Sequence, residues 1–224
     1  MTVDEVMKQL EAAGTAQNRK VYARHGIGEP LFGVSFAALR SLAKAIKVDH
    51  ELARGLWATG NHDARMLATM VADPDRFDGR TFDRWAKDLR NYVVTDAFSQ
   101  LVSRSTLARE KMEAWSAAGS EWTSRVGWRL LSYLALEHDD LGDEFFEERL
   151  GVIERDIHDR PNFTRAAMNG ALIAIGLRNA KLEKKAIAAA KRIGKVEVDH
   201  GETNCETPDA IAYIAKAKAR RRPR

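Results

Sequence analysis

Hydrophobic residues recur along this chain at helical spacing, and residues that can cap a helix stand where the periodic segments begin. In the first segment the apolar stripe consists of Val3, Val6, Met7 and Leu10. Thr2 and Glu5 precede this stripe at capping-box spacing, and Gly14 ends it. Further helix starts, each with a residue suited to a first turn, are predicted near Ser35, Asp49, Asn61, Thr81, Thr106, Ser120, Asn162 and Thr207.

The same pattern predicts an all-α fold. Four prolines, at positions 30, 74, 161 and 208, fall in the breaks between periodic segments, and no alternating run of the kind typical of a strand appears. We therefore expect about a dozen helices of roughly 10 to 18 residues. Many short consecutive helices favour an α-solenoid, because each helix pair has an apolar side that the next pair can cover. No motif returns at a fixed spacing, so a compact irregular bundle is the alternative.

The segment from Tyr92 to Ser103 is the most informative of the predicted helices. Its expected core stripe consists of Val94, Ala97, Phe98 and Leu101. Its expected opposite side consists of Tyr92, Asp96, Ser99 and Ser103. Tyr92 and Asp96 would thus lie one turn apart and face away from the core. An ordinary exposed helix face is the alternative interpretation of this pair.

A second predicted helix, from Trp122 to Leu136, carries aromatic rings and guanidinium groups on one side. Its expected core stripe consists of Gly127, Leu130, Leu131, Leu134 and Ala135. The stripe outside the core consists of Trp122, Arg125, Arg129 and Tyr133. Arginines can contact phosphates while rings meet sugars or bases, so this stripe predicts a nucleic-acid contact. Packing of Trp122 and Tyr133 against a neighbouring helix is the alternative.

Length and charge add a domain prediction. The 224 residues fit one domain, with two small domains as the alternative. We expect a single domain over residues 1–215, followed by a flexible basic tail over 216–224. Six of the cations lie in this tail, so the remaining chain has a net charge of −2 although the whole chain has +4. Residues 137–159 carry a net charge of −8, and residues 160–195 carry +8. The basic run is suited to a polyanion, or forms a solvated face beside the acidic one.

Several function classes lack any support in the sequence. The chain has no apolar run of about 18 residues and no signal-peptide pattern at its N-terminus, so we expect a cytoplasmic protein without a membrane span. A single cysteine, Cys205, excludes an internal disulfide. Residues 199–205 hold metal-ligand types, but loop and cap roles explain them better. Phosphate-binding loops, dinucleotide fingerprints and nucleophile elbows are absent, so no cofactor is expected, and a monomer is favoured.

Residues spread over most of the chain resemble one known family. They are Leu31, Phe32, Gly33, Val34, Phe36, Leu39, Arg40, Leu42, Ala43, Leu56, Trp57, His62, Asp63, Arg65, Tyr92 and Asp96. In order and spacing these residues resemble the DNA alkylation repair (AlkD-type) family. The resemblance implies a solenoid of HEAT-like antiparallel helix pairs that holds duplex DNA in a basic groove. It also implies a glycosylase that releases N3- or N7-alkylated purines.

The resemblance transfers the family's site only in part. It assigns a catalytic role to Asp96 and Tyr92, with Tyr92 standing where the family has tryptophan. It assigns DNA contact to Arg125, and we extend this prediction to Trp122, Arg129 and Arg165. A second family tryptophan falls at Gly170. Smaller or missing rings would weaken cation–π attraction, which is worth about 0.5 to 2 kcal/mol per ring, so excision would slow about ten- to a hundredfold.

The predicted chemistry depends on the carboxylate. Loss of a cationic purine builds positive charge on the deoxyribose, which a neighbouring carboxylate stabilises, as in glycosidases. Three functions follow from the sequence: a glycosylase for alkylpurines that uses Asp96, a non-catalytic binder of DNA or another structured nucleic acid, and a protein-interaction scaffold. Salt-dependent binding separates the first two from the third.

Overall fold

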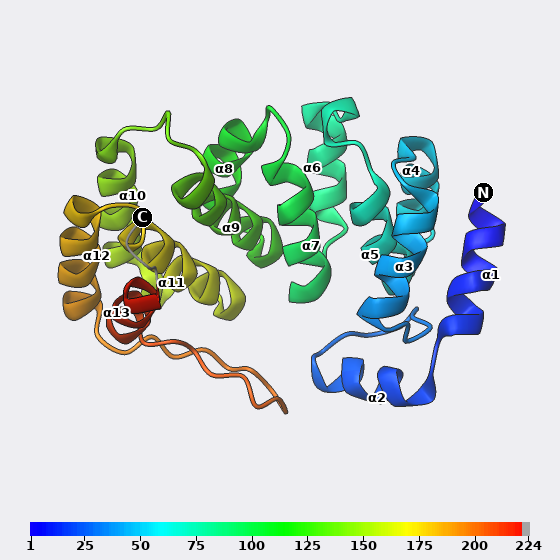
Figure 1. Ribbon diagram of the computed structural model, residues 1–224. Helices are drawn as coiled ribbons and strands as arrows, with labels where there is room; N and C mark the ends of the chain where they lie inside the picture. Colours follow the sequence, from blue (N-terminus) through cyan, green and yellow to red (C-terminus); the bar gives the residue numbers. More distant parts are fainter. Residues whose placement is uncertain (221–224) are drawn as a thin grey trace. The chain divides into compact units, whose positions relative to one another are not determined.

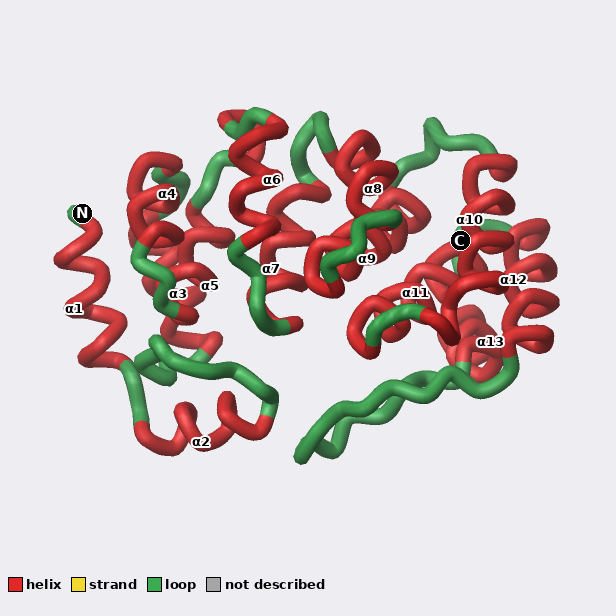
Figure 2. The backbone as a smooth tube through the Cα atoms, turned by 180° about the vertical axis from the view of Figure 1, so that it is seen from behind, coloured by secondary structure: helices red, strands yellow, loops and turns green. Residues whose placement is uncertain are grey.

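The computed structural model describes residues 1–220, and all the regular elements within them are helices (Figures 1 and 2). The α-helices are α1 Val3–Ala13, α2 Ala16–Arg24, α3 Phe36–Ile46, α4 His50–Ala58, α5 His62–Val71, α6 Gly79–Lys87, α7 Tyr92–Ser103, α8 Ala108–Ser116, α9 Glu121–Glu137, α10 Asp143–Asp156, α11 Asn162–Gly176, α12 Ala180–Ile193 and α13 Ala210–Arg220. Two short 3₁₀ segments are η1 Pro74–Arg76 and η2 Ile157–Asp159. None of the helices within residues 1–220 combines the length and apolarity needed to cross a membrane.

Four of the predicted helix starts are confirmed by observed side-chain caps, while α9 and α11 begin near Ser120 and Asn162 as predicted but without a side-chain cap. Thr2 forms the complete capping box with Glu5, and the side chains of Ser35, Asp49 and Asn61 each accept a first-turn N–H. Helix α6 begins two residues before Thr81 and is capped by Asp78 rather than by Thr81, and α8 begins two residues after Thr106. The start at Thr207 is wrong. Asp209 accepts the N–H of Ala212 at 2.8 Å, so α13 begins at Ala210.

The described chain divides into two compact units. The first comprises Met1–Leu107 together with His200–Asn204, and the second comprises the rest, from Ala108 to Asp199 and from Cys205 onward. The single domain over 1–215 stays a prediction. The start of the flexible tail at Lys216 is wrong, because α13 continues to Arg220, while residues 221–224 lie outside the described residues.

In the first unit α5 packs against α3, α4 and α7, and α1 packs against α4 and α5. Aromatic rings fill much of the interior between α4, α6 and α7. The rings of Trp57 and Trp85 stack with 4.0 Å between centroids, and Phe98 approaches both. This packing holds α7 between other elements. Ser99 and Ser103, which we predicted to face outward, are therefore buried. Only a narrow strip of α7, which includes Tyr92 and Asp96, is exposed to solvent.

In the second unit α9 is the central helix and packs against α8 and α11. Its predicted core stripe is buried throughout, including Gly127. A Cβ atom at Gly127 would lie 2.2 Å from the backbone nitrogen of Ser116, so glycine allows α9 to approach the end of α8. Gly176 has a comparable role, since its missing side chain makes room for Ile214 of α13.

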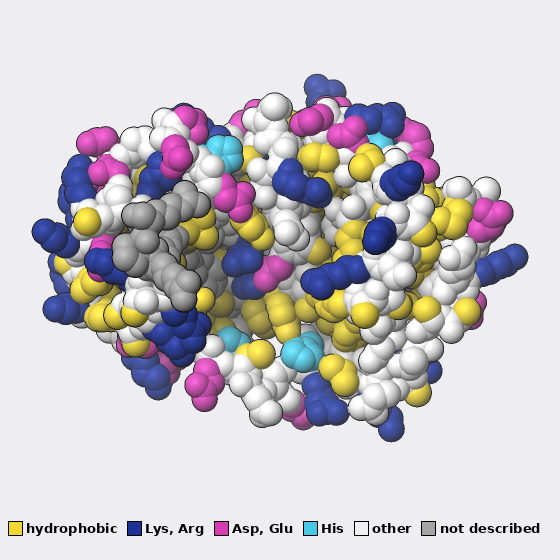
Figure 3. Space-filling model, viewed as in Figure 1, with side chains coloured by type: hydrophobic (Ala, Val, Ile, Leu, Met, Phe, Trp, Pro, Cys, Tyr) yellow, Lys and Arg dark blue, Asp and Glu magenta, His cyan; other side chains and the backbone are white. Residues whose placement is uncertain are grey.

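The acidic and basic runs predicted from the sequence become facing helices. Lys181 of α12 lies 3.2 Å from Glu147 and 3.4 Å from Asp143 of α10, and Lys185 lies 2.5 Å from Glu147. Arg192 pairs with Glu154 through two nitrogens. Figure 3 shows acidic and basic side chains intermingled over these two helices. Much of the +8 of residues 160–195 is thus neutralised within the unit rather than available to a polyanion.

The α10–α12 ion pairs predict how stability depends on pH. Hydrogen bonds from Lys185 and then Lys181 lower the pKa of Glu147, and the hydrogen bond from Arg192 lowers that of Glu154. A depressed pKa contributes stability above the ordinary value of 4.5, and that stability is lost as the pH falls through the folded-state pKa. We expect the melting temperature to fall once the pH is below about 4.5, and Glu147→Gln to make this decline shallower. Circular dichroism melts at successive pH values test this, with exposed Glu202→Gln as the control. If the melting temperature depended on pH equally weakly in both variants, the prediction would be wrong.

Candidate nucleic-acid interface

Helix α7 places Tyr92 and Asp96 one turn apart near its N-terminus, as predicted. The Asn91 side chain caps the helix by accepting the N–H groups of Val93 and Val94, each at 3.1 Å. Both Tyr92 and Asp96 are partly exposed. The Tyr92 hydroxyl contacts Nδ1 of His25, the residue that ends α2, and the two ring centroids are 6.1 Å apart. A tyrosine at this position therefore has a polar partner that its own helix does not supply.

His25 was missed by the sequence reasoning, and only the adjacent helix reveals it. The same helix α2 contributes Tyr22, whose ring lies edge-on to His62 at 5.4 Å and whose hydroxyl donates to the Val34 carbonyl at 2.5 Å. Burial first, and the charge of Asp63 second, raise the pKa of Tyr22, so this tyrosine remains neutral. Helix α2 is thereby fixed against α5 and α7 beside the candidate site.

Asp63 stabilises a loop of the protein and is not accessible to a ligand. It is fully buried, and its carboxylate accepts backbone N–H groups of Phe32, Gly33 and Val34 at 2.6, 3.0 and 2.9 Å. Gly33 has φ of +80°, which favours glycine in this turn. The segment from Leu31 to Val34, on which the family resemblance partly rests, is thus a loop folded around one buried carboxylate.

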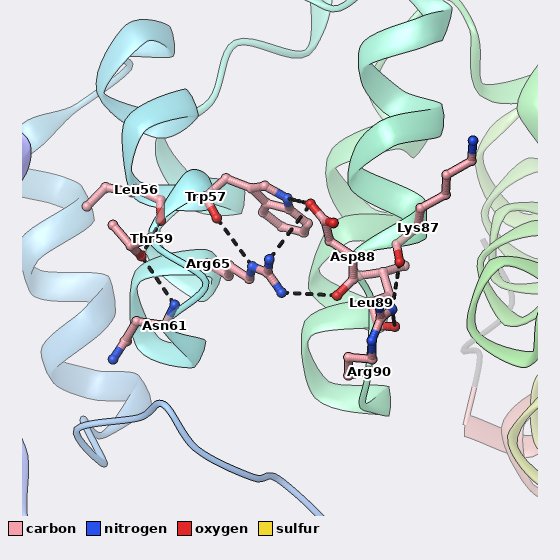
Figure 4. A network of polar contacts seen from close by, with 9 residues as sticks. All are labelled: Leu56, Trp57, Thr59, Asn61, Arg65, Lys87, Asp88, Leu89 and Arg90. Atoms are coloured by element: carbon pink, nitrogen blue, oxygen red, sulfur yellow. Dashed lines mark hydrogen bonds and ion pairs between the residues drawn. The ribbon is translucent and has the colours of Figure 1, made fainter.

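Arg65 and Asp88 join three helices in a second network (Figure 4). Nε1 of Trp57 donates to Asp88 Oδ2 at 2.9 Å, and Arg65 donates to the backbone carbonyls of Trp57 and Asp88 at 3.3 and 3.0 Å. The Arg65 guanidinium also lies 5.2 Å from the centre of the Trp57 ring. Burial lowers the pKa of Arg65, while Asp88 opposes that effect. The network connects α4, α5 and the end of α6.

In the second unit the predicted stripe on α9 divides into a packed part and an open part. Trp122 stacks on Phe163 of α11 with 5.1 Å between centroids, which is the alternative we gave for it. Arg125 is only 7% exposed, and its Nη1 donates to the Phe163 carbonyl at 2.9 Å. Its predicted exposure is wrong, because the first turn of α11 covers this side of α9. Arg129 and Tyr133 remain partly exposed, with the guanidinium 5.5 Å from the ring centre.

Arg165 has a structural task that the sequence did not reveal. It donates to the carbonyls of Glu197 at 2.8 Å and of His158 and Arg160 at 3.1 Å each. Asn162 adds two hydrogen bonds to the backbone of Asp199, both 2.7 Å long. These contacts anchor residues 194–199 on α11, so a phosphate would have to compete with three carbonyls for Arg165.

Gly170, at the position of the second family tryptophan, is partly exposed on α11. A Cβ atom added there would meet no atom within 4 Å among the described residues, so the helix backbone is accessible at this point. Within residues 1–220 the side chains form no group of three or more His, Cys, Asp or Glu suited to a metal ion, and this includes the segment 199–205.

Comparison with known proteins adds the family. The model of the family described as "DNA alkylation repair enzyme" matches residues 6–214 of this chain. The chain belongs to the DNA alkylation repair enzyme family. Uncharacterized proteins of Listeria innocua and Listeria monocytogenes are 30% and 29% identical over 226 residues, covering 98% of this chain and 99% of each relative.

A solved structure is similar to this family member over nearly its whole length. It is described as a new family of proteins related to the HEAT-like repeat DNA glycosylases, with affinity for branched DNA structures. It is 33% identical with a TM-score of 0.90, covering 98% of this chain and 95% of the other. This likeness and the all-helical architecture confirm the predicted α-solenoid of HEAT-like helix pairs.

Proposed function

We propose that this protein binds branched DNA and recognises it by phosphate positions and shape. The observation that carries the proposal is the full-length similarity to a solved protein with affinity for branched DNA. The charge arrangement supports it. Lys181, Lys185 and Arg192 are paired with acids, which reduces the number of unpaired cations that the second unit offers to a uniform duplex. A branch point brings several phosphate backbones together, which lets a small number of cations make more contacts.

Binding to a four-way junction is expected to exceed binding to a duplex of equal length by about tenfold, or about 1.4 kcal/mol. For both DNA substrates, log K should decrease linearly as the logarithm of the salt concentration increases, because phosphate contacts release counterions. Fluorescence anisotropy at several salt concentrations measures both quantities. Arg129→Ala should weaken junction binding, whereas the double variant Lys181→Ala/Lys185→Ala should leave it nearly unchanged because these lysines are paired with acids.

Equal affinity for junction and duplex would contradict the recognition of branches. It would favour the duplex binding that we expected from the sequence. Absence of binding at low salt, or binding indifferent to salt, would favour the protein-interaction scaffold.

Excision of cationic N3- or N7-alkylpurines is a second candidate function, and the position of Asp96 favours it. Its carboxylate is partly exposed on α7, one turn from Tyr92, so it is accessible to a bound sugar. A carboxylate there would stabilise the positive charge that develops on the deoxyribose as the base departs. The glycosidic bond breaks and its electron pair leaves with the purine, which becomes a neutral base. The attacking water gives its hydroxyl group to the sugar carbon and its proton to the Asp96 carboxylate, which passes it to solvent. A neutral lesion would need an acid that protonates the leaving base, so we expect activity only on cationic lesions.

A further inference from the structure

A small cavity in the first unit lies directly beside the start of α7. It has a volume of about 130 Å³, and the loop before α3, the start of α5, the end of α6 and the start of α7 all contribute to its lining. This space equals about four water molecules at roughly 30 Å³ each, which suits a compact group such as a phosphate. Asn91, one of the lining residues, is the neighbour of Tyr92 in the chain.

Two arginines line the cavity, and both are held in place from within the protein. Arg65 is fixed by the carbonyls of Trp57 and Asp88 (Figure 4). Arg90 is exposed and uses Nη1 to donate to the carbonyls of Lys87 at 2.6 Å and Leu89 at 2.7 Å. Among the described residues, Arg90 makes only these two hydrogen bonds, both through Nη1. Its Nη2 and Nε are therefore available to a ligand. A guanidinium presented in this way can bind a phosphate with two parallel hydrogen bonds.

The two carboxylates of the lining already have donors. Asp88 Oδ2 accepts Nε1 of Trp57 and lies 3.7 Å from Nη2 of Arg65, and Glu29 Oε2 accepts the Leu31 N–H at 2.9 Å. The acids offset the two arginines in net charge. An anion bound here would therefore be held by the placement of its donors rather than by excess positive charge.

The backbone around the cavity also favours an anion. His62 is the first residue of α5 and Asn91 is the N-cap of α7, so two helices direct their positive ends toward this region. Gly60 has φ of +72°, and added Cβ atoms at Gly28 and Gly60 would meet nothing within 4 Å, which leaves the backbone approachable. His62 is 5% exposed and its Nδ1 has no hydrogen-bond partner among the described residues. Burial lowers the pKa of His62, so the neutral imidazole adds no charge but can donate a hydrogen bond.

From this convergence we propose that the cavity binds one phosphate group of the nucleic acid, with Arg90 as its principal ligand and Arg65 as a fixed positive charge in the wall. The proposal rests on the proposed DNA-binding function and adds a defined contact to it. A phosphate held beside Asn91 would fix the strand next to Tyr92, so the cavity would set the register of the DNA on α7.

The first test uses inorganic phosphate alone and needs no DNA. In ¹H–¹⁵N spectra we expect saturable shifts of the Gly28, Gly60 and Asn91 amides, with an affinity in the millimolar range that is typical of one ion (about −4 kcal/mol). Arg90→Ala should abolish them. Arg80→Ala is the control, since Arg80 is an exposed cation of α6 outside the cavity lining. Shifts that stay linear and unchanged in Arg90→Ala would overturn the proposal, whatever the DNA affinity is.

The second test uses a DNA junction. Arg90→Ala should weaken binding about tenfold at low salt and lower the slope of log K against log salt by about 0.9, as expected for one lost phosphate contact. Arg80→Ala should change the affinity less than twofold, and unchanged melting temperatures would confirm that both variants fold. An equal effect of the two variants would overturn the assignment to nucleic acid even if inorganic phosphate binds. If the wild-type protein fails to bind DNA at all while phosphate still saturates the amides, the proposed function fails rather than the anion site.

Discussion

Asp63→Ala is expected to lower the free energy of unfolding by about 3 to 5 kcal/mol, the largest loss of stability among the substitutions considered. The variant removes the acceptor of three backbone N–H groups, of which those of Gly33 and Val34 are buried and that of Phe32 is partly buried. Each unpaired donor in such a place costs about 1 to 3 kcal/mol. Urea denaturation followed by circular dichroism measures the effect.

Asp63→Asn separates hydrogen bonding from charge. The amide keeps one acceptor oxygen but turns an NH₂ group toward the same donors, so we expect a loss nearly as large as for alanine. Asp75→Ala is the matched control because this acid is exposed in η1, and it should change stability by less than about 0.5 kcal/mol. A loss below about 1 kcal/mol for Asp63→Ala would show that the loop rearranges to satisfy its own donors.

Asp96→Asn should reduce the release of 7-methylguanine from duplex DNA by at least about a hundredfold, or about 2.7 kcal/mol, if the protein is a glycosylase. The substitution preserves shape but removes the charge that faces the developing cation. DNA affinity should therefore change by less than about twofold. Single-turnover release with excess protein measures the rate, and anisotropy measures binding.

Tyr92 provides the comparison for Asp96. Tyr92→Phe removes the contact with His25 but keeps the ring, whereas Tyr92→Ala removes both, and each should slow release less than Asp96→Asn. A wild-type protein that binds methylated duplex but releases no base during long incubation would eliminate the glycosylase candidate and leave the binder. Unchanged release by Asp96→Asn would mean that the family correspondence of α7 is wrong.

The sequence predicted those features that depend on one helix at a time. The bounds of α7 agree with the prediction, and the buried stripe of α9 from Gly127 to Ala135 follows from its own periodicity. The caps at Thr2, Ser35, Asp49 and Asn61 were predictable, whereas the starts of α9 and α11 have no side-chain cap, and at other starts a second polar residue takes the role. At the start of α13 both Thr207 and Asp209 are suited to the role, and only the backbone path shows that Asp209 is used.

Contacts between distant segments were beyond this reasoning. Periodicity places Arg125 outside the stripe of α9 but cannot show that α11 covers that side. His25 and Tyr92 are 67 positions apart, so nothing in either local pattern connects them. The anchoring of residues 194–199 by Arg165 was missed for the same reason. The sequence alone does not distinguish an arginine that binds a phosphate from one that donates to three backbone carbonyls, as Arg165 does.

The ion pairs between α10 and α12 have an evolutionary consequence. Exposed pairs of this kind contribute about 0 to 1 kcal/mol each, so replacing an acid of α10 by a neutral residue is a nearly neutral step for folding. One such replacement at Glu147 would release Lys185, while Lys181 would keep Asp143 at 3.4 Å as a remaining partner on α10. Descendants of this protein could thus gain a basic surface without acquiring a single new lysine. Relatives that share these lysines can differ widely in electrostatic affinity, and the acids opposite α12 are the positions at which such divergence should be sought.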